Sequence, residues 1–169
     1  MDAVTVEQIT AEADVSPRTF FNYFDNKYAA VVEAPPGVEQ MLAAALSARP
    51  AHEPMLTAWR EAWAETLPYN AEQLHRKISL VRANPVLAAP YRAAVGRFEQ
   101  IVVQWAAERT GLDPRRSAYP HLLGTISIAA VNLIFERWNP ETGLAGLRAV
   151  HAEVFDLLER GLNNPSGYA

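Results

Sequence analysis

The chain has 169 residues, of which 50% are hydrophobic and 20% charged, and this composition is typical of a packed globular protein rather than a disordered one. It contains no cysteine, which excludes disulfide bonds, cysteine nucleophiles and thiolate metal sites. With no recognisable signal peptide, we expect a cytoplasmic protein. The longest strongly apolar stretch, residues 122–135, is interrupted by polar residues and is too short to cross a bilayer, so no membrane association is expected.

Helical periodicity runs through nearly the whole chain and strand signals are scarce, which predicts an all-α fold. Three short helices are expected first, over residues 5–13, over residues 17–24 and from residue 27 onwards. Ser16 and Asn26 are suited to cap the second and third of these helices, because their side chains can accept hydrogen bonds from free backbone N–H groups.

Longer helices are expected after the sequence Pro35-Pro36-Gly37, which must end or sharply kink the third helix. Proline, glycine or asparagine marks the breaks between them, and we place them over residues 38–48, 54–67, 70–83, 86–110, 115–138 and 142–162. Residues 163–169 are expected to form a frayed tail. We therefore divide the chain into a helix-turn-helix segment, 1–34, and a helical ligand-binding and dimerisation domain, 35–169.

The first two helices, with a compact turn between them, have the form of a helix-turn-helix. On the second helix, Phe20 and Phe24 share one face by their i, i+4 spacing and should be buried. Arg18 and Asn22 lie roughly opposite, and their side chains suit guanine and adenine edges respectively. Two flanking residues carry hydroxyls that can reach phosphates, Thr19 and Tyr23.

Residues 5–9 (TVEQI) and 13–27 (ADVSPRTFFNYFDNK) resemble the signature of the TetR family of transcriptional regulators. The resemblance implies a dimer that binds a double-stranded, pseudo-palindromic DNA operator, usually as a repressor, and that an unidentified small-molecule effector releases. It also implies a set of residues that cap the recognition helix, face the major groove or contact phosphate: Thr5, Ser16, Pro17, Arg18, Thr19, Asn22, Tyr23 and Lys27. Phe21 departs from the commonest pattern, in which a tyrosine at this position contacts phosphate.

Two features of residues 1–34 weigh against DNA binding. This segment carries six acidic and two basic residues, a net charge of −4, whereas a DNA-binding segment is usually basic. Members of the resembled family also begin with a further helix, while here Met1 directly precedes the helix-turn-helix. A shortened chain and a natural variant both remain open, and we favour shortening. The alternative function is then a small-molecule-binding or interaction protein that has lost DNA binding.

The C-terminal part of the sequence predicts both a dimer interface and a ligand pocket. The helix around residues 122–135 is apolar almost all round and needs cover on both sides, so we expect the last two helices to form an intersubunit four-helix bundle in a homodimer. The middle helices supply aromatic side chains and a few polar ones, as small-molecule pockets require. The candidate pocket residues are Trp59, Trp63, His75, Tyr91, Phe98, Trp105, His121, Thr125 and Asn132.

An enzyme is the main competing class. The four histidines show no metal-ligand spacing, and the sequence has no glycine-rich phosphate loop, nucleophile elbow or paired-carboxylate signature. We therefore expect no catalytic residues, no metal site and no cofactor. The break at Pro35-Pro36 lies between the two predicted units, and we hypothesise that it acts as a hinge when ligand binding is transmitted to the DNA-binding segment.

Overall fold

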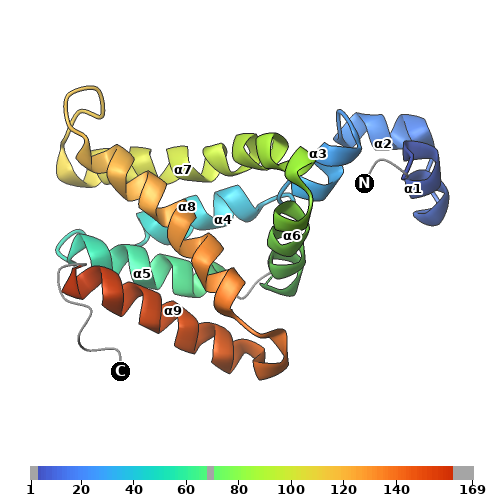
Figure 1. Cartoon of the computed structure of the whole chain (residues 1–169). Coiled ribbons are helices and arrows are strands. Elements are labelled where there is room, and N and C mark those ends of the chain that lie inside the picture. Colours follow the sequence, from blue (N-terminus) through green and yellow to red (C-terminus); the bar gives the residue numbers. More distant parts are fainter. Residues whose placement is uncertain (1–3, 68–70, 162–169) are drawn as a thin grey trace.

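The computed structural model describes residues 4–67 and 71–161, and every regular element within these ranges is a helix, which confirms the predicted all-α fold (Figure 1). The α-helices are α1 Val6–Glu12, α2 Pro17–Tyr23, α3 Lys27–Val32, α4 Val38–Ser47, α5 Met55–Thr66, α6 Ala71–Ala83, α7 Ala88–Thr110, α8 Tyr119–Arg137 and α9 Gly143–Arg160. Short 3-10 turns, Pro85–Leu87 and Pro140–Thr142, precede α7 and α9. The predicted tail, residues 163–169, and the break at Pro68 lie outside the described residues.

The start of α8 is the largest departure from the expected boundaries. The sequence predicts this helix from residue 115, but a local turn occupies the preceding residues. The Arg115 backbone N–H donates to the Asp113 carboxylate (2.9 Å), and the Ser117 N–H donates to the Asp113 carbonyl (2.9 Å). The Ser117 hydroxyl then accepts from the Tyr119 N–H (3.3 Å). The turn thus satisfies these backbone N–H groups, two of them through the side chains of Asp113 and Ser117, and the helix begins only at Tyr119.

The helices α4–α9 form one packed body, and α1 and α2 stand apart from it at one end (Figure 1). Helix α8 runs through this body and packs against α7, α6 and α9, while α3 joins α1 and α2 to the body by packing against α6 and α7. The core is built from large side chains with less than 2% exposure, including Trp59, Phe135, Phe155, Leu42 and Leu46. No helix in the described part of the chain is long and apolar enough to cross a membrane.

Helices α7 and α8 approach each other closely at Gly124. A Cβ atom at this position would lie 2.7 Å from Cγ2 of Val103, closer than real Cβ contacts allow, and 3.1 Å from the Glu99 carbonyl oxygen, which is tighter than most such contacts. Glycine is therefore needed here for packing. This contact fixes the spacing of the two longest helices.

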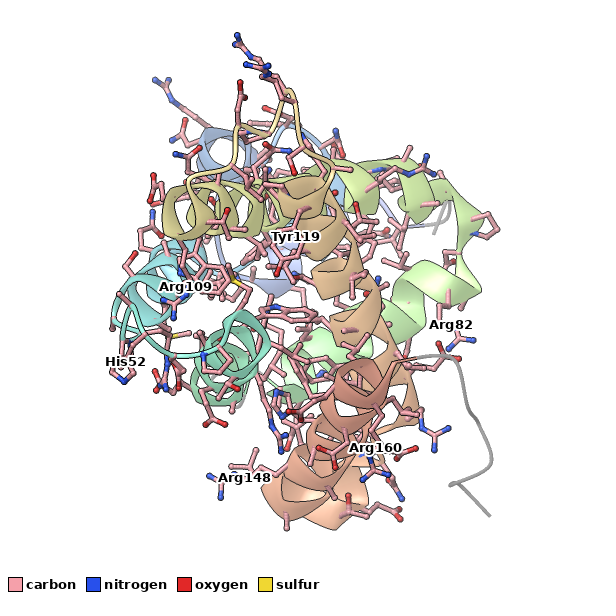
Figure 2. All side chains as sticks on the ribbon, turned by 90° about the vertical axis from the view of Figure 1, so that its left-hand side faces the viewer. His52, Arg82, Arg109, Tyr119, Arg148 and Arg160 are labelled. Carbon is pink, nitrogen blue, oxygen red and sulfur yellow. The ribbon has the colours of Figure 1, made fainter. Side chains whose placement is uncertain are left out.

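Arg109, near the C-terminus of α7, holds the loop between α4 and α5 (Figure 2). Its guanidinium donates to the carbonyl oxygens of Pro50 (2.5 Å) and Glu53 (2.7 Å), and it lies 5.6 Å from the centre of the Trp105 ring. A guanidinium suits this position because its fixed array of N–H groups can serve several acceptors at once. The loop is thus tied to the end of the body farthest from α1 and α2.

His151 on α9 is buried beside Phe155, with ring centres 4.5 Å apart, and its Nε2 atom has no hydrogen-bond partner. Burial, and secondarily the charge of Arg60, lowers the pKa of His151 from 6.5 to about 4. Between these two values the unfolded chain binds a proton that the folded chain does not. The contribution of His151 to stability is therefore complete above about pH 6.5 and is lost as the pH falls to about 4.

Replacing His151 by leucine should flatten the dependence of stability on pH in this window. We expect the wild-type free energy of unfolding to fall between pH 6.5 and 4 by up to roughly 3 kcal/mol more than that of His151→Leu. Urea unfolding at several pH values measures this difference. His52→Leu, at an exposed site, is the matched control and should retain the wild-type slope. An unchanged slope in His151→Leu would show that the histidine is already protonated in the folded chain.

Candidate nucleic-acid interface and ligand cavity

Side-chain caps define the starts of α1 and α2. The Thr5 hydroxyl accepts from the Gln8 backbone N–H (3.3 Å), and the Gln8 side chain accepts in return from the Thr5 N–H (2.9 Å), which forms a capping box. Ser16 caps α2 by accepting from the Thr19 N–H (3.0 Å), and Pro17 occupies the first helical position, where its missing N–H costs nothing. These short helices therefore begin at the positions that the sequence predicts.

The turn between α1 and α2 is tight. Asp14 adopts a left-handed backbone conformation with φ of 51°, which aspartate tolerates better than most residues other than glycine and asparagine. The Val15 N–H donates to the Thr10 carbonyl (3.0 Å), and the Thr10 hydroxyl donates to the Glu7 carbonyl (3.1 Å). The bond from Val15 and the left-handed Asp14 end α1 and let α2 begin at Pro17 in a different direction (Figure 1).

Helix α2 has one buried and one exposed face, as its periodicity predicts. Phe20 is buried as predicted, and its ring centre lies 5.4 Å from that of Phe24. Phe24, which was also expected to be buried, is only half-buried, because α2 ends at Tyr23 and Phe24 has an extended backbone. Arg18 and Asn22 are both exposed. Tyr23 is 75% exposed, which leaves its hydroxyl accessible.

Three further candidates, and Phe21, lie near this face. Ser16 and Pro17 are exposed, and Thr19 is half-buried with its hydroxyl 2.9 Å from that of Ser16. Phe21 is 55% exposed and packs edge-on against Phe20. The exposed side of α2 therefore combines groups suited to base edges with hydroxyls suited to phosphates.

Lys27 brings the starts of α1 and α3 together. Its ammonium donates to the Val4 carbonyl (2.9 Å), directly before Thr5, and it lies 5.3 Å from the centre of the Tyr28 ring. Asn26 caps α3 by accepting from the Tyr28 and Ala29 N–H groups, both at 3.0 Å. Two of the expected phosphate-contacting residues, Thr5 and Lys27, are therefore neighbours, and a phosphate contact by either one stays a prediction.

One side of α1 is open. Val4 is 44% exposed, and with Ile9 and Ala13 it lines a shallow groove whose edges are Gln8 and Glu12. The described residues cover this apolar side only in part.

A partly open cavity lies in the body, next to the link between α3 and α4. Its volume is about 70 Å³, and its wall is almost entirely apolar. Helices α3 to α8 and the segment after α3 all contribute, and the lining residues are Val32, Ala34, Val38, Leu42, Trp63, Thr66, Leu67, Leu74, Lys77, Tyr91, Ala94, Val95, Phe98, Ile128, Val131 and Asn132.

The few polar groups of this wall are well defined. The Tyr91 hydroxyl donates to the Asn132 side-chain oxygen (2.6 Å), and burial raises the pKa of Tyr91 to about 12, so the phenol stays protonated and acts as a donor. The Lys77 ammonium donates to the Glu33 carbonyl (2.5 Å) at the end of α3. Trp63 Nε1 is buried and has no hydrogen-bond partner.

Four of the nine candidate pocket residues line this cavity together: Trp63, Tyr91, Phe98 and Asn132. The sequence did not single out Lys77, which is the one charged side chain among the lining residues that the structure describes. The sequence does contain a pattern that could have predicted the burial of Lys77. Lys77 follows Leu74 by three residues on a helix and thus falls on the apolar side of α6.

The structure places the other five candidates elsewhere. Trp59 is in the core, with its ring centre 4.7 Å from that of Phe155, and Trp105 is buried under Arg109. His75 Nδ1 lies 2.8 Å from the Phe135 carbonyl oxygen. Thr125 and His121 are both exposed on α8. The Thr125 hydroxyl donates to the Glu99 carboxylate (2.8 Å), and His121 is in contact with solvent.

An all-helical body that carries a helix-turn-helix at its N-terminal end defines the class of DNA-binding transcriptional regulators. The family model described as bacterial regulatory proteins, tetR family, matches residues 1–34. A second model, described as the MftR C-terminal domain, matches residues 49–163. The chain is also similar to the HTH-type transcriptional regulator TcmR of Streptomyces glaucescens, with 27% identity over 165 residues that cover 91% of this chain and 73% of TcmR.

The chain belongs to the TetR family of transcriptional regulators. This assignment supports a regulatory protein rather than an enzyme. The match over residues 49–163 also includes most of the cavity wall, from Trp63 to Asn132.

Proposed function

We propose that this protein is a repressor that binds a pseudo-palindromic DNA operator as a homodimer and is released when a small apolar or aromatic molecule enters its cavity. The observation that carries this proposal is the exposed face of α2. Arg18 and Asn22 project from a helix that Ser16 caps and that Phe20 anchors on its opposite side. A helix fixed in this way can present the same two side chains to the major groove each time it binds.

The N-terminal ends of α1 and α3 support the placement of the phosphate backbone beside α2. Backbone N–H groups at helix starts attract anions, and Thr5 and Lys27 stand together at these two starts. The acidic residues of this part of the chain weaken long-range attraction to DNA. Specific contacts must therefore supply a larger share of the affinity, which makes the protein sensitive to loss of either base-reading side chain.

An apolar stripe on α8 supports dimerisation. Leu122 is 57% exposed and Leu133 is 41% exposed, and Ile126 and Ala129 lie between them at helical spacing. On α9, Leu144 is also exposed. Large exposed apolar side chains that follow one helix face are typical of subunit interfaces. A second copy related by two-fold symmetry would cover them and would also pair the recognition helices.

Substitution of either base-reading residue should weaken operator binding. We expect Arg18→Ala and Asn22→Ala each to cost about 1–3 kcal/mol of binding free energy on DNA from the promoter region of the protein's own gene. Arg116→Ala is the matched control, because Arg116 is an exposed arginine in the loop at the far end of the body. Fluorescence anisotropy over a salt series measures the affinities and the number of phosphate contacts.

The same titration tests the alternative function. If the wild-type chain shows no preference for promoter DNA over random DNA at any salt concentration, the repressor proposal fails. The alternative, a small-molecule-binding or interaction protein without DNA binding, would then be favoured. Equal losses in Arg18→Ala and Arg116→Ala would indicate that arginine charge alone, and not base reading, determines the affinity.

Charges placed on the α8 stripe should separate the subunits. We expect Leu122→Glu combined with Leu133→Glu to shift the protein from dimer to monomer at micromolar concentration in sedimentation equilibrium, because burying two carboxylates in an apolar interface is strongly unfavourable. Leu80→Glu, at a similarly exposed leucine on α6, should leave the dimer intact. A monomeric wild-type protein, or a variant that remains dimeric, would contradict an interface on α8.

A further inference from the structure

We propose that the cavity binds an apolar molecule that carries a carboxylate, and that this carboxylate takes the Lys77 ammonium away from the Glu33 carbonyl and so frees the end of α3. The ligand class is inferred from the cavity wall alone. The expected weakening of DNA binding when the ligand enters rests on the proposed function.

The first observation is the charge of the wall. Lys77 is 7% exposed, and its ammonium makes no ion pair with any described residue. It can donate three hydrogen bonds and makes one, to the Glu33 carbonyl. Burial lowers the pKa of Lys77, and the nearby Glu33 carboxylate opposes this shift. A buried ammonium with spare donors and no anion of its own is a binding partner for an anionic ligand.

The second observation is an excess of donors. Trp63 also lines the cavity, and its Nε1 atom is buried without an acceptor. A buried donor that lacks a partner is unfavourable, and a ligand oxygen would supply the partner. Among the described residues of the cavity wall there is no aspartate or glutamate that could receive a cationic ligand. The wall therefore favours a ligand with acceptor oxygens on an otherwise apolar body.

The third observation is the size of the cavity. A volume of about 70 Å³ is less than the roughly 150 Å³ of an engineered apolar cavity that admits benzene. A ligand as large as an aromatic ring must therefore widen the cavity. Its wall includes Val32, Ala34 and Val38, which flank the link between α3 and α4. Helical hydrogen bonds do not hold this link, so it can move more readily than the helices around it.

Glu33 is the point at which such a movement would reach α3. Its carbonyl accepts from Lys77 on α6, and its carboxylate pairs with Arg97 on α7, which also donates to Glu39 on α4 (2.7 Å). A ligand carboxylate would replace the bond from Lys77 and leave the Arg97 pairs in place. The end of α3 would then be held from one side only, and the tilt of α1 and α2 would change with it.

Isothermal titration calorimetry of the full chain with two matched pairs of probes tests the ligand class: 2-naphthoate against 2-naphthamide, and octanoate against octanamide. The two members of each pair have nearly the same shape, and only the carboxylate carries a negative charge. We expect at least one carboxylate to bind roughly tenfold or more tightly than its amide. If no carboxylate binds better than its amide, including the case in which no probe binds, the proposal is overturned.

Substitutions at Lys77 and at its neighbour Arg76 test whether Lys77 is responsible for the preference for the carboxylate. Lys77→Gln should abolish the preference for the carboxylate, and Arg76→Gln should retain it, because this variant loses the same charge one residue away at an exposed site. Far-ultraviolet circular dichroism establishes that both variants are folded. Should Lys77→Gln misfold, Lys77→Arg provides a second test, since it keeps the charge and should keep the preference. A folded Lys77→Gln that still prefers the carboxylate would overturn the role of Lys77.

The effect on DNA is measured separately. We expect the preferred carboxylate, at a concentration that saturates wild-type protein, to weaken promoter binding by wild type and Arg76→Gln but not by Lys77→Gln. Carboxylate binding that leaves promoter affinity unchanged would overturn the link through Glu33. A chain that binds the carboxylate but never binds promoter DNA would overturn the proposed repressor function, while the ligand class would stand on the calorimetry.

Discussion

The hydrogen bond from the Lys77 ammonium to the Glu33 carbonyl ties α6 to the end of α3, and the coupling that we propose between the cavity and the helix-turn-helix depends on this contact. Desolvating an ammonium is costly, and this one is buried on an apolar wall with a single acceptor. The acceptor is the C-cap residue of α3, where helix carbonyls lack partners and the helix dipole favours a positive charge. The contact therefore stabilises both the buried charge and the end of the helix that carries the DNA-binding segment.

The DNA-binding segment itself has little core with which to fix its own position. Phe20 and Thr10 are its buried residues within α1 and α2, and the order of these helices rests largely on caps and on the turn at Asp14. Its attachment to the body passes through α3, which packs against α6 and α7. A small displacement of α3 must therefore appear at α2. The body contributes rigidity through close packing, such as that of α7 on α8 at Gly124.

The sequence was most informative where a single helix sets the geometry. The spacing of Phe20 and Phe24 predicted the buried side of α2 and hence the exposure of Arg18 and Asn22, because helical periodicity alone determines these directions. Ser16 and Asn26 were recognised as caps for the same local reason. Thr5, the side-chain cap of α1, was also placed at a helix start.

The cavity could be predicted only in part, because its wall depends on how separate helices meet. Trp63 and Trp59 are four residues apart on α5, yet only Trp63 lines the cavity, while Trp59 packs against α9. Thr125 suggested a buried polar group, but its neighbours on α8 turn it towards solvent and Glu99. Lys77 was missed because lysine is normally exposed, and only the assembled body shows that its chain reaches inward to α3.

Hydrogen–deuterium exchange of the α3 amides, without ligand or DNA, tests most directly whether Lys77 holds this helix. The comparison is between wild type, Lys77→Gln and Arg76→Gln. If the Lys77 contact fixes the end of α3, peptides spanning residues 27–34 exchange faster in Lys77→Gln, while those from α5 and α9 are unchanged and Arg76→Gln matches wild type. Equal exchange of residues 27–34 in all three proteins would show that α3 is held by other contacts and would contradict this account.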